Sequence, residues 1–225
     1  MDPGSDFKKV SEGQLPRFTG AHSVCVGEDG ALYIVASRMD SVFRAAPGKS
    51  SKWCVEPYWT LPGSSGDSDE NHLNAIDLVD GELYVSGFGE KKLDQWTSAT
   101  DGFVYNIDRG EYVLRGLHHP HSLLEDSGVV WTTESAESRV VSDSGDNFTL
   151  PTGYIRGLAI GEERMYVGSS KRRVISESTG KINRQSSGEF KGYCCIYGLK
   201  RDSETPEILV DFSDSRNEIY EMLLL

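Results

Sequence analysis

The chain has 225 residues, a length that suits one domain with a substantial hydrophobic core. Its formal net charge of −12 at pH 7 disfavours binding to the phosphate backbone of nucleic acids. No apolar run is long enough to cross a membrane, and the first residues lack the apolar segment of a signal peptide. We therefore expect a cytoplasmic protein with neither nucleic-acid nor membrane partners.

The four cysteines do not have the spacing of a zinc site or of a disulfide framework. They are Cys25, Cys54, Cys194 and Cys195. We expect them to be reduced thiols that pack as small hydrophobic side chains, which agrees with a reducing compartment.

Short apolar runs, each preceded by a tight turn, dominate the sequence, and helical periodicity is nearly absent. Each run carries a central aromatic residue, as is typical of the second strand of a hairpin. In chain order, these aromatic residues are Tyr33, Tyr84, Trp131 and Tyr166.

The segment before each turn also repeats, with one polar residue, one spacer and one aliphatic residue. The five copies are His22-Ser-Val24, Asn74-Ala-Ile76, His121-Ser-Leu123, Arg156-Gly-Leu158 and Asn217-Glu-Ile219. Dividing 225 residues among five copies gives about 45 residues each, close to the length of a four-stranded propeller blade.

We therefore predict an all-β chain in which residues 1–225 form a single β-propeller of five four-stranded blades. The last copy, 217–225, leaves room for only one strand. The N-terminal segment is expected to complete that blade, so that N- and C-terminal strands close the ring.

The innermost strands of a propeller surround its axis, so the repeated polar residues are expected to meet there. These are His22, Asn74, His121, Arg156 and Asn217. Because side chains alternate along a strand, the residues two positions earlier should face the same way. They include His72, His119 and Tyr154. Polar residues at strand starts can also serve only to satisfy loop backbone, and this alternative stays open.

The types of these residues favour a small anionic or polyhydroxyl ligand at the mouth of the central channel. Arg156 offers a planar fork to an anion, and Asn74 and Asn217 offer amide donors. His22, His119 and Tyr154 complete the expected binding set, and His121 and His72 are the candidates for proton transfer. We lean towards a non-redox acid–base enzyme, such as a lyase, isomerase, cyclase or hydrolase, with no cofactor.

Two other functions compete with this prediction. The first is a non-catalytic scaffold that binds a protein partner through the loops 62–71 and 176–191. The second is a metalloenzyme with a divalent metal held by His22, His72, His119 and His121. Arg156 argues against the metal, because a permanent cation beside it is costly. Lys171–Arg173 could supply local positive charge for an anion, although a solvated cluster is favoured.

Several of these segments together resemble a known family. They include Gly20-Ala-His22, the stretch His72–Ile76, the stretch Arg115–Ser122 and the stretch Tyr154–Ala159. They continue through Tyr166–Arg173 to Asn217-Glu-Ile-Tyr220. In this order they resemble an uncharacterised, mostly bacterial family of propeller-like proteins with a domain of unknown function. The resemblance implies a propeller and a cytoplasmic location, and it implies no established reaction.

Overall fold

The computed structural model describes residues 19–48, 53–172, 180–181, 192–200, 203 and 205–223. Within them the chain is all-β, and its strands form four antiparallel sheets of four strands each. In every sheet the strands follow one another in chain order, as they do in a meander. The all-β expectation is therefore confirmed.

The sheets are numbered 1 to 4 along the chain. Sheet 1 contains β1 (Ala21–Val26), β2 (Leu32–Ala36), β3 (Ser41–Pro47) and β4 (Trp53–Thr60). Sheet 2 contains β5 (Leu73–Val79), β6 (Glu82–Gly87), β7 (Gly102–Asn106) and β8 (Glu111–Leu117). Sheet 3 contains β9 (Pro120–Asp126), β10 (Val129–Glu134), β11 (Arg139–Ser142) and β12 (Asn147–Thr149). Sheet 4 contains β13 (Tyr154–Ile160), β14 (Arg164–Ser170), β15 (Cys195–Lys200) and β16 (Glu207–Asp211). Short 3₁₀ helices follow β2, precede β7 and follow β10, at η1 (Ser37–Met39), η2 (Trp96–Ser98) and η3 (Ser135–Glu137).

Two of the tight turns expected before the apolar runs are two-residue hairpin turns. Asp80-Gly81 joins β5 to β6 with φ values of 48° and 80°, and Ser127-Gly128 joins β9 to β10 with 56° and 80°. Positive φ at both central residues is the requirement of the turn that matches the twist of a hairpin. These two dipeptides therefore fix the register of the two hairpins.

Three separate hydrophobic cores lie between successive sheets. Sheets 1 and 2 share a core that includes Val35 and Val85, and sheets 2 and 3 share one that includes Val104 and Val130. Sheets 3 and 4 share a third core, which includes Val140 and Val167. Alternation along each strand sends neighbouring side chains to opposite faces, so a central sheet contributes to two cores.

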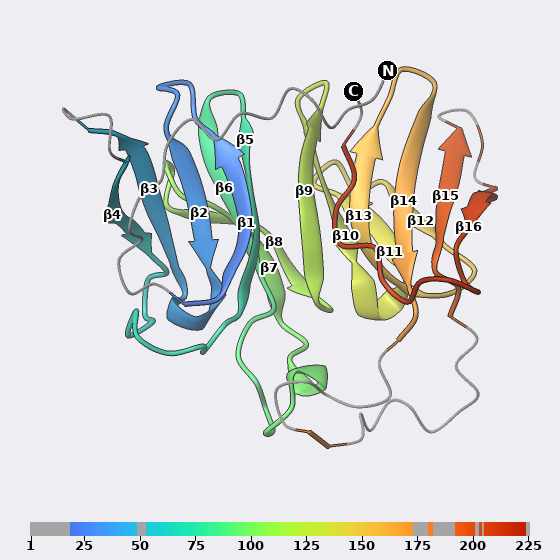
Figure 1. Ribbon diagram of the computed structural model, residues 1–225, viewed down its shortest axis with the longest axis horizontal. Coiled ribbons are helices and arrows are strands. Elements are labelled where there is room, and N and C mark those ends of the chain that lie inside the picture. Colours follow the sequence, from blue (N-terminus) through green and yellow to red (C-terminus); the bar gives the residue numbers. More distant parts are fainter. Residues whose placement is uncertain are drawn as a thin grey trace.

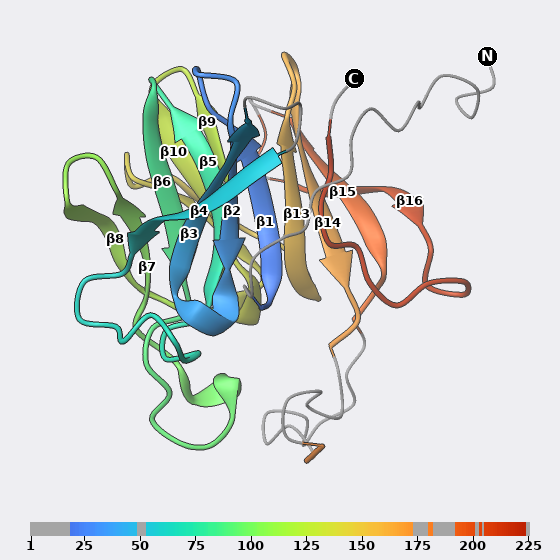
Figure 2. The same cartoon turned by 60° about the vertical axis from the view of Figure 1, so that its left-hand side comes forward.

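The first strands of the sheets lie side by side in chain order. Strand β1 packs against β5, β5 against β9, and β9 against β13. Figure 1 shows the sheets succeeding one another from the blue sheet 1 to the orange and red sheet 4. Figure 2 shows β1, β5, β9 and β13 between β8 on one side and β16 on the other, and Figure 1 shows β4 at the outer edge of sheet 1. This arrangement is that of successive propeller blades.

The fifth blade differs from the expectation. Residues 212–223 form no strand, so the strand predicted at Asn217–Ile219 is wrong. The N-terminal segment that should complete this blade lies outside the described residues. The described part of the chain contains four four-stranded sheets, and the blade count and ring closure stay predictions.

The cysteines are free thiols, as expected. Cys25, Cys194 and Cys195 are buried, and burial raises the pKa of Cys25 to about 12. Cys54 on β4 is instead exposed. In the described residues, no helix has the length and apolar character needed to span a membrane.

Candidate functional site

A β-bulge interrupts each of the four inner strands at its repeated polar residue. The register between the first two strands of the sheets shifts at His22, at 74–75, at 121–122 and at 156–157. In sheet 1, two steps along the inner strand correspond to one step along its neighbour, and in sheets 2, 3 and 4 three steps correspond to two. A bulge bends the strand and redirects a side chain. The polar residue of the repeat is therefore the residue that the bulge re-aims.

The residue before each of the first three inner strands has a left-handed backbone. Gly20 has φ of 75°, and His72 and His119 have φ of 51° and 57°. Residues other than glycine rarely adopt this backbone conformation, and backbone strain of this kind is often found at functional sites. The carbonyl groups of His72 and His119 accept hydrogen bonds from the amides of Phe88 and Ser135, both at 3.3 Å. The backbone thus holds the two histidine side chains in place beside the bulges.

The predicted residues converge in a group that we call the hub cluster. It contains His22, His72, Phe88, His119, His121, Tyr154 and Arg156. The ring centroids of His22 lie 5.6 Å from His72 and 6.5 Å from His121. His121 lies 5.4 Å from the Tyr154 ring, which in turn lies 5.1 Å from the guanidinium carbon of Arg156. Residues from all four sheets therefore meet, as the repeat predicts, and their roles stay predictions.

His121 is fully buried, and its hydrogen bonds define its tautomer. Its Nδ1 lies 3.0 Å from the carbonyl oxygen of His119 and 2.7 Å from Ser135 Oγ. Because a carbonyl oxygen only accepts, Nδ1 carries the hydrogen and Nε2 is the acceptor. Burial, and then the positive charge of Arg156, lower the pKa of His121 well below 6.5. His121 is therefore a neutral imidazole at pH 7.

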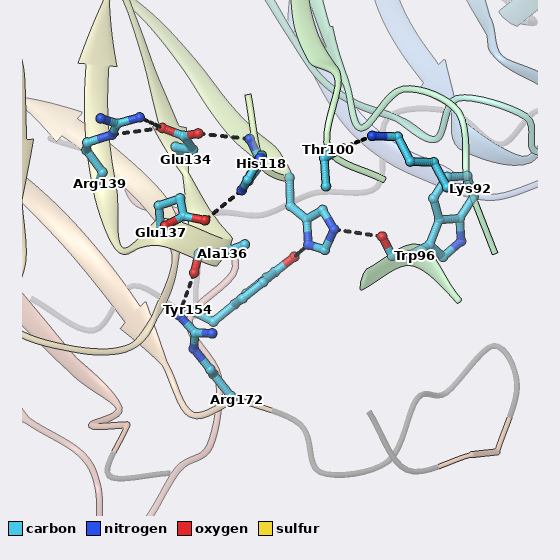
Figure 3. A network of polar contacts seen from close by, with 11 residues as sticks. Lys92, Trp96, Thr100, His118, Glu134, Ala136, Glu137, Arg139, Tyr154 and Arg172 are labelled. Atoms are coloured by element: carbon cyan, nitrogen blue, oxygen red, sulfur yellow. Dashed lines mark hydrogen bonds and ion pairs between the residues drawn. The ribbon is translucent and has the colours of Figure 1, made fainter. Parts of the chain in front are cut away.

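His119 is held at both ring nitrogens. Figure 3 labels its two partners, Trp96 and Tyr154. Its Nε2 donates to the carbonyl oxygen of Trp96 at 2.7 Å, and its Nδ1 accepts from the Tyr154 hydroxyl at 3.0 Å. The ring also stacks on Phe88, with centroids 4.5 Å apart. Burial lowers the pKa of His119 to about 4. These bonds give His119 a positioning role and leave its nitrogens engaged by protein groups.

His72 is oriented by a carboxylate from the preceding loop. Its Nδ1 lies 3.2 Å from both carboxylate oxygens of Asp69. Its ring contacts Phe88 and Trp96, at centroid distances of 4.7 Å and 4.6 Å. A carboxylate at Nδ1 directs the hydrogen to that nitrogen and presents Nε2 as the basic atom. The pKa of the neighbouring His22 is lowered to about 4, first by desolvation and then by the charges of His72 and Arg156, although His22 keeps an exposed edge.

Arg156 contacts two tyrosine rings and one carboxylate. Its guanidinium lies over Tyr220 at 4.4 Å, and its Nη1 forms an ion pair of 3.3 Å with Glu218 Oε2. The Arg156 side chain is 11% exposed, so the charge stands in a poorly hydrated place. A single contact of this length uses only part of the five N–H donors of a guanidinium.

Two buried donors at the bulges are left without a partner. In the part of the chain that the structure describes, neither Asn74 Nδ2 nor Arg156 Nε has a hydrogen-bond acceptor. An unsatisfied buried donor costs about 1–3 kcal/mol. Both atoms come from residues at repeat positions, where the bulges re-aim the side chains. Arg156 belongs to the hub cluster, and Asn74 on β5 follows the cluster member His72 by two residues.

The structure does not bring Asn217 into the hub cluster as predicted. Asn217 is exposed, and its carbonyl oxygen accepts a hydrogen bond from the Lys171 amide at 2.8 Å. The neighbouring Glu218 reaches Arg156 instead. The prediction required residues 217–219 to form a strand in which Asn217 faces the axis. These residues form no strand, and the side chain that reaches Arg156 is that of Glu218.

Sequence reasoning also missed Phe88, Trp96, Asp69 and Ser135. None of them occupies a repeat position: Asp69 lies in a loop, Trp96 begins η2, and Phe88 and Ser135 come just after second strands. Phe88 and Ser135 could have been predicted from a shared position, because each lies one residue after the second strand of its sheet, β6 or β10.

The described residues do not form the predicted four-histidine metal site. Among them, no three His, Cys, Asp or Glu side chains are grouped so that they could hold a metal ion. The physical reason is visible at His119 and His121, whose Nδ1 atoms, together with His119 Nε2, already bond to protein atoms.

The loop 62–71, predicted as a partner-binding segment, is tied to the body of the protein by Asp40. The buried Asp40 accepts at Oδ2 from the Asn71 amide at 2.7 Å and from the Glu70 amide at 3.1 Å. Burial raises the pKa of Asp40. This anchoring is what places Asp69 against His72.

The second predicted loop, 176–191, lies outside the described residues except for 180–181. Of the basic cluster beside it, Lys171 donates to the Ser213 carbonyl at 2.5 Å and Arg172 to the Ala136 carbonyl at 2.6 Å (Figure 3 shows the latter). Arg173 lies outside the described residues.

The chain was compared with curated proteins, with solved structures and with protein families. Comparison with curated protein sequences gives no match. The chain is similar to virginiamycin B lyase from Staphylococcus aureus, with 16% identity and a TM-score of 0.48 over 82% of this chain and 64% of the lyase. It is similar to an extracellular domain from B. thetaiotaomicron, with 13% identity and a TM-score of 0.50 over 84% of this chain and 23% of the other. It is also similar to a luciferin-regenerating enzyme, with 14% identity and a TM-score of 0.49 over 92% of this chain and 80% of the enzyme.

These likenesses concern the fold alone, and the chain spans 64% of the length of the lyase. The sequence profile of one family matches residues 14–225. The chain therefore belongs to the family described as Domain of unknown function, DUF4915.

Proposed function

We propose that this protein binds a small anionic or polyhydroxyl molecule at the hub cluster. The observation that carries the proposal is the pair of buried donors without an acceptor in the described residues, Asn74 Nδ2 and Arg156 Nε. A ligand oxygen would satisfy both donors and would recover the free energy that their burial costs. Arg156 would also neutralise a negative charge on the ligand.

In this proposal His121 and His72 have different roles. His121 is neutral and presents Nε2 as an acceptor, so it orients a ligand hydroxyl or N–H group. A strongly lowered pKa makes it a poor carrier of a proton at pH 7. His72 is the better candidate for proton transfer, because Asp69 holds its ring and directs its second nitrogen outward. The chemistry we propose is therefore acid–base chemistry without redox steps.

The proposal is tested by isothermal titration calorimetry with citrate, gluconate, inorganic phosphate and glucose. We expect saturable binding of at least one anionic probe. Arg156→Lys and Asn74→Leu should each weaken that binding at least about tenfold, because each removes a donor that the ligand would satisfy. The matched controls are Arg115→Lys and Asn147→Leu, which change exposed residues outside the hub cluster and should bind as the wild type does.

Equal affinity of the wild type and the Arg156 and Asn74 variants would contradict the proposal. So would the absence of binding of all four probes by both the wild type and Glu218→Gln, the variant that frees Arg156 from its ion pair.

A further inference from the structure

The C-terminal residues 217–223, which we call the strap, run along sheet 4 without forming a strand. Hydrogen bonds at Asn217 and at Ile219 hold the backbone of the strap. The Lys171 amide donates to the Asn217 carbonyl at 2.8 Å. Ser170 Oγ accepts from the Ile219 amide at 2.9 Å and donates to the Ile219 carbonyl at 3.0 Å. A segment that lies outside the strand pairing of a sheet can open locally while the sheet below it stays folded.

Glycines in sheet 4 provide the space in which the strap lies. A Cβ atom on Gly168 of β14 would stand 2.7 Å from Ile219 Cγ2. A Cβ atom on Gly157 of β13 would stand 2.9 Å from Met222 Cγ. Any larger residue at either position would push the strap away. The two glycines of sheet 4, which also carries Arg156, therefore leave the space that the strap occupies.

The strap places its own carboxylate on the anion-binding group of the hub cluster. Glu218 Oε2 lies 3.3 Å from Arg156 Nη1, and Tyr220 covers the guanidinium at 4.4 Å. The contact leaves Arg156 Nε without an acceptor among the described residues. A free carboxylate can take two parallel N–H groups of a guanidinium and would satisfy more donors than Glu218 does.

We propose that the ligand of the hub cluster is a carboxylate and that it binds by displacing Glu218 from Arg156 and releasing the strap. This inference rests on the proposed function and adds the ligand class and its control. A neutral polyhydroxyl compound cannot replace the negative charge of Glu218, so it would leave Arg156 without its counter-ion. The strap thus acts as an internal competitor that favours acids over neutral sugars.

Calorimetry with the full-length protein tests the competition. Glu218→Gln removes the charge but keeps the shape of the side chain, and it should bind citrate or gluconate at least about tenfold more tightly than the wild type. Glucose should gain no affinity, and phosphate should gain less than the carboxylates. Glu221→Gln is the matched control, because it removes the same charge from an exposed position of the same strap.

Amide hydrogen exchange gives a second measure that does not depend on affinity. The Ile219 and Lys171 amides, which hold the strap, should be protected in the free wild type and should lose protection in saturating citrate or gluconate.

The inference is overturned if Glu218→Gln binds carboxylates no more tightly than the wild type, if phosphate gains most, or if both amides stay protected in the complex. Continued dependence on Arg156 and Asn74 would then leave the proposed function standing. Failure of every probe to bind either protein would instead remove the proposed function itself.

Discussion

Histidine is the residue that distinguishes this chain, because three histidines of one cluster are held by three different means. His121 is buried against Ser135, His119 is bonded between Trp96 and Tyr154, and His72 is paired with a carboxylate. Burial keeps the first two neutral at pH 7. We propose that the same residue type provides an acceptor, a positioning element and a proton carrier within one cluster.

The lowered pKa of His119 predicts a pH dependence of stability. Its pKa falls from 6.5 to about 4 on folding, so between these pH values the unfolded chain takes up a proton that the folded chain does not. The free energy of unfolding therefore decreases as the pH falls from 6.5 towards 4. Glutamine at this position can still donate to Trp96 and accept from Tyr154. In His119→Gln the decrease should be smaller by about 1 kcal/mol per pH unit.

Urea unfolding of the wild type and of His119→Gln at a series of pH values measures this difference. Parallel pH profiles for the two proteins would show that His119 does not resist protonation in the folded state.

At the residue scale, the sequence predicted the histidines, Arg156 and Tyr154 but not their other partners. His22, His121 and Arg156 could be found because each begins a repeat that starts an inner strand. Glu218 could not be found, because its inward direction depends on a segment that only looks like a strand. Asp69 could not be placed, because its position depends on a loop anchored by the distant Asp40.

At the scale of elements, the bulges and the segment 88–101 build the cluster together. The bulges aim the polar residues of the inner strands, and the segment between β6 and β7 supplies Phe88 and Trp96, whose rings contact His72. Gly89 begins this segment with φ of 77°, and its amide donates to the Asn71 carbonyl at 3.1 Å. The backbone at Gly89 therefore joins the segment to the loop that carries Asp69.

Alanine substitution of two glycines with positive φ, Gly89 and Gly128, tests whether the backbone at Gly89 holds the segment 88–101 in place. A Cβ atom on Gly89 would stand 2.4 Å from the carbonyl oxygen of Asp101, whereas one on Gly128 would meet no atom within 4 Å. Both alanine variants carry the cost of a left-handed residue, roughly 1–2 kcal/mol. Gly89→Ala should lose about 2 kcal/mol more than Gly128→Ala, because backbone must move to admit the methyl group.

Denaturant unfolding measures both losses, and near-ultraviolet circular dichroism reports on Trp96. Equal stability of the two variants would mean that the backbone around Gly89 yields freely and does not hold the segment.

The repeat revealed the inner and second strands but not the bulges. Alternation alone predicts that residues two apart share a face, and it places His72 and His119 with the polar ring. The register shift at each polar residue is set by pairing with the second strand, which the pattern of apolar residues does not record.

At the scale of the whole molecule, the three cores between successive sheets explain why distant residues meet. Each sheet buries apolar side chains against the next, which brings the four inner strands together. The turn dipeptides and the central aromatic residues were enough to predict this stacking. The fifth blade was inferred from Asn217–Ile219 alone, and a single short motif cannot distinguish a strand from an extended strap that lies along a sheet.

The central claim is that four blades bring Asn74 and Arg156 together as the binding groups of one site. A crystal structure of the full-length protein grown with citrate tests it most directly. We predict electron density for citrate within hydrogen-bond distance of Asn74 Nδ2 and Arg156 Nε, with the rings of His22, His72 and His121 around it. A structure in which these five side chains lie apart, or in which citrate binds elsewhere while the hub cluster stays unchanged, would contradict the account.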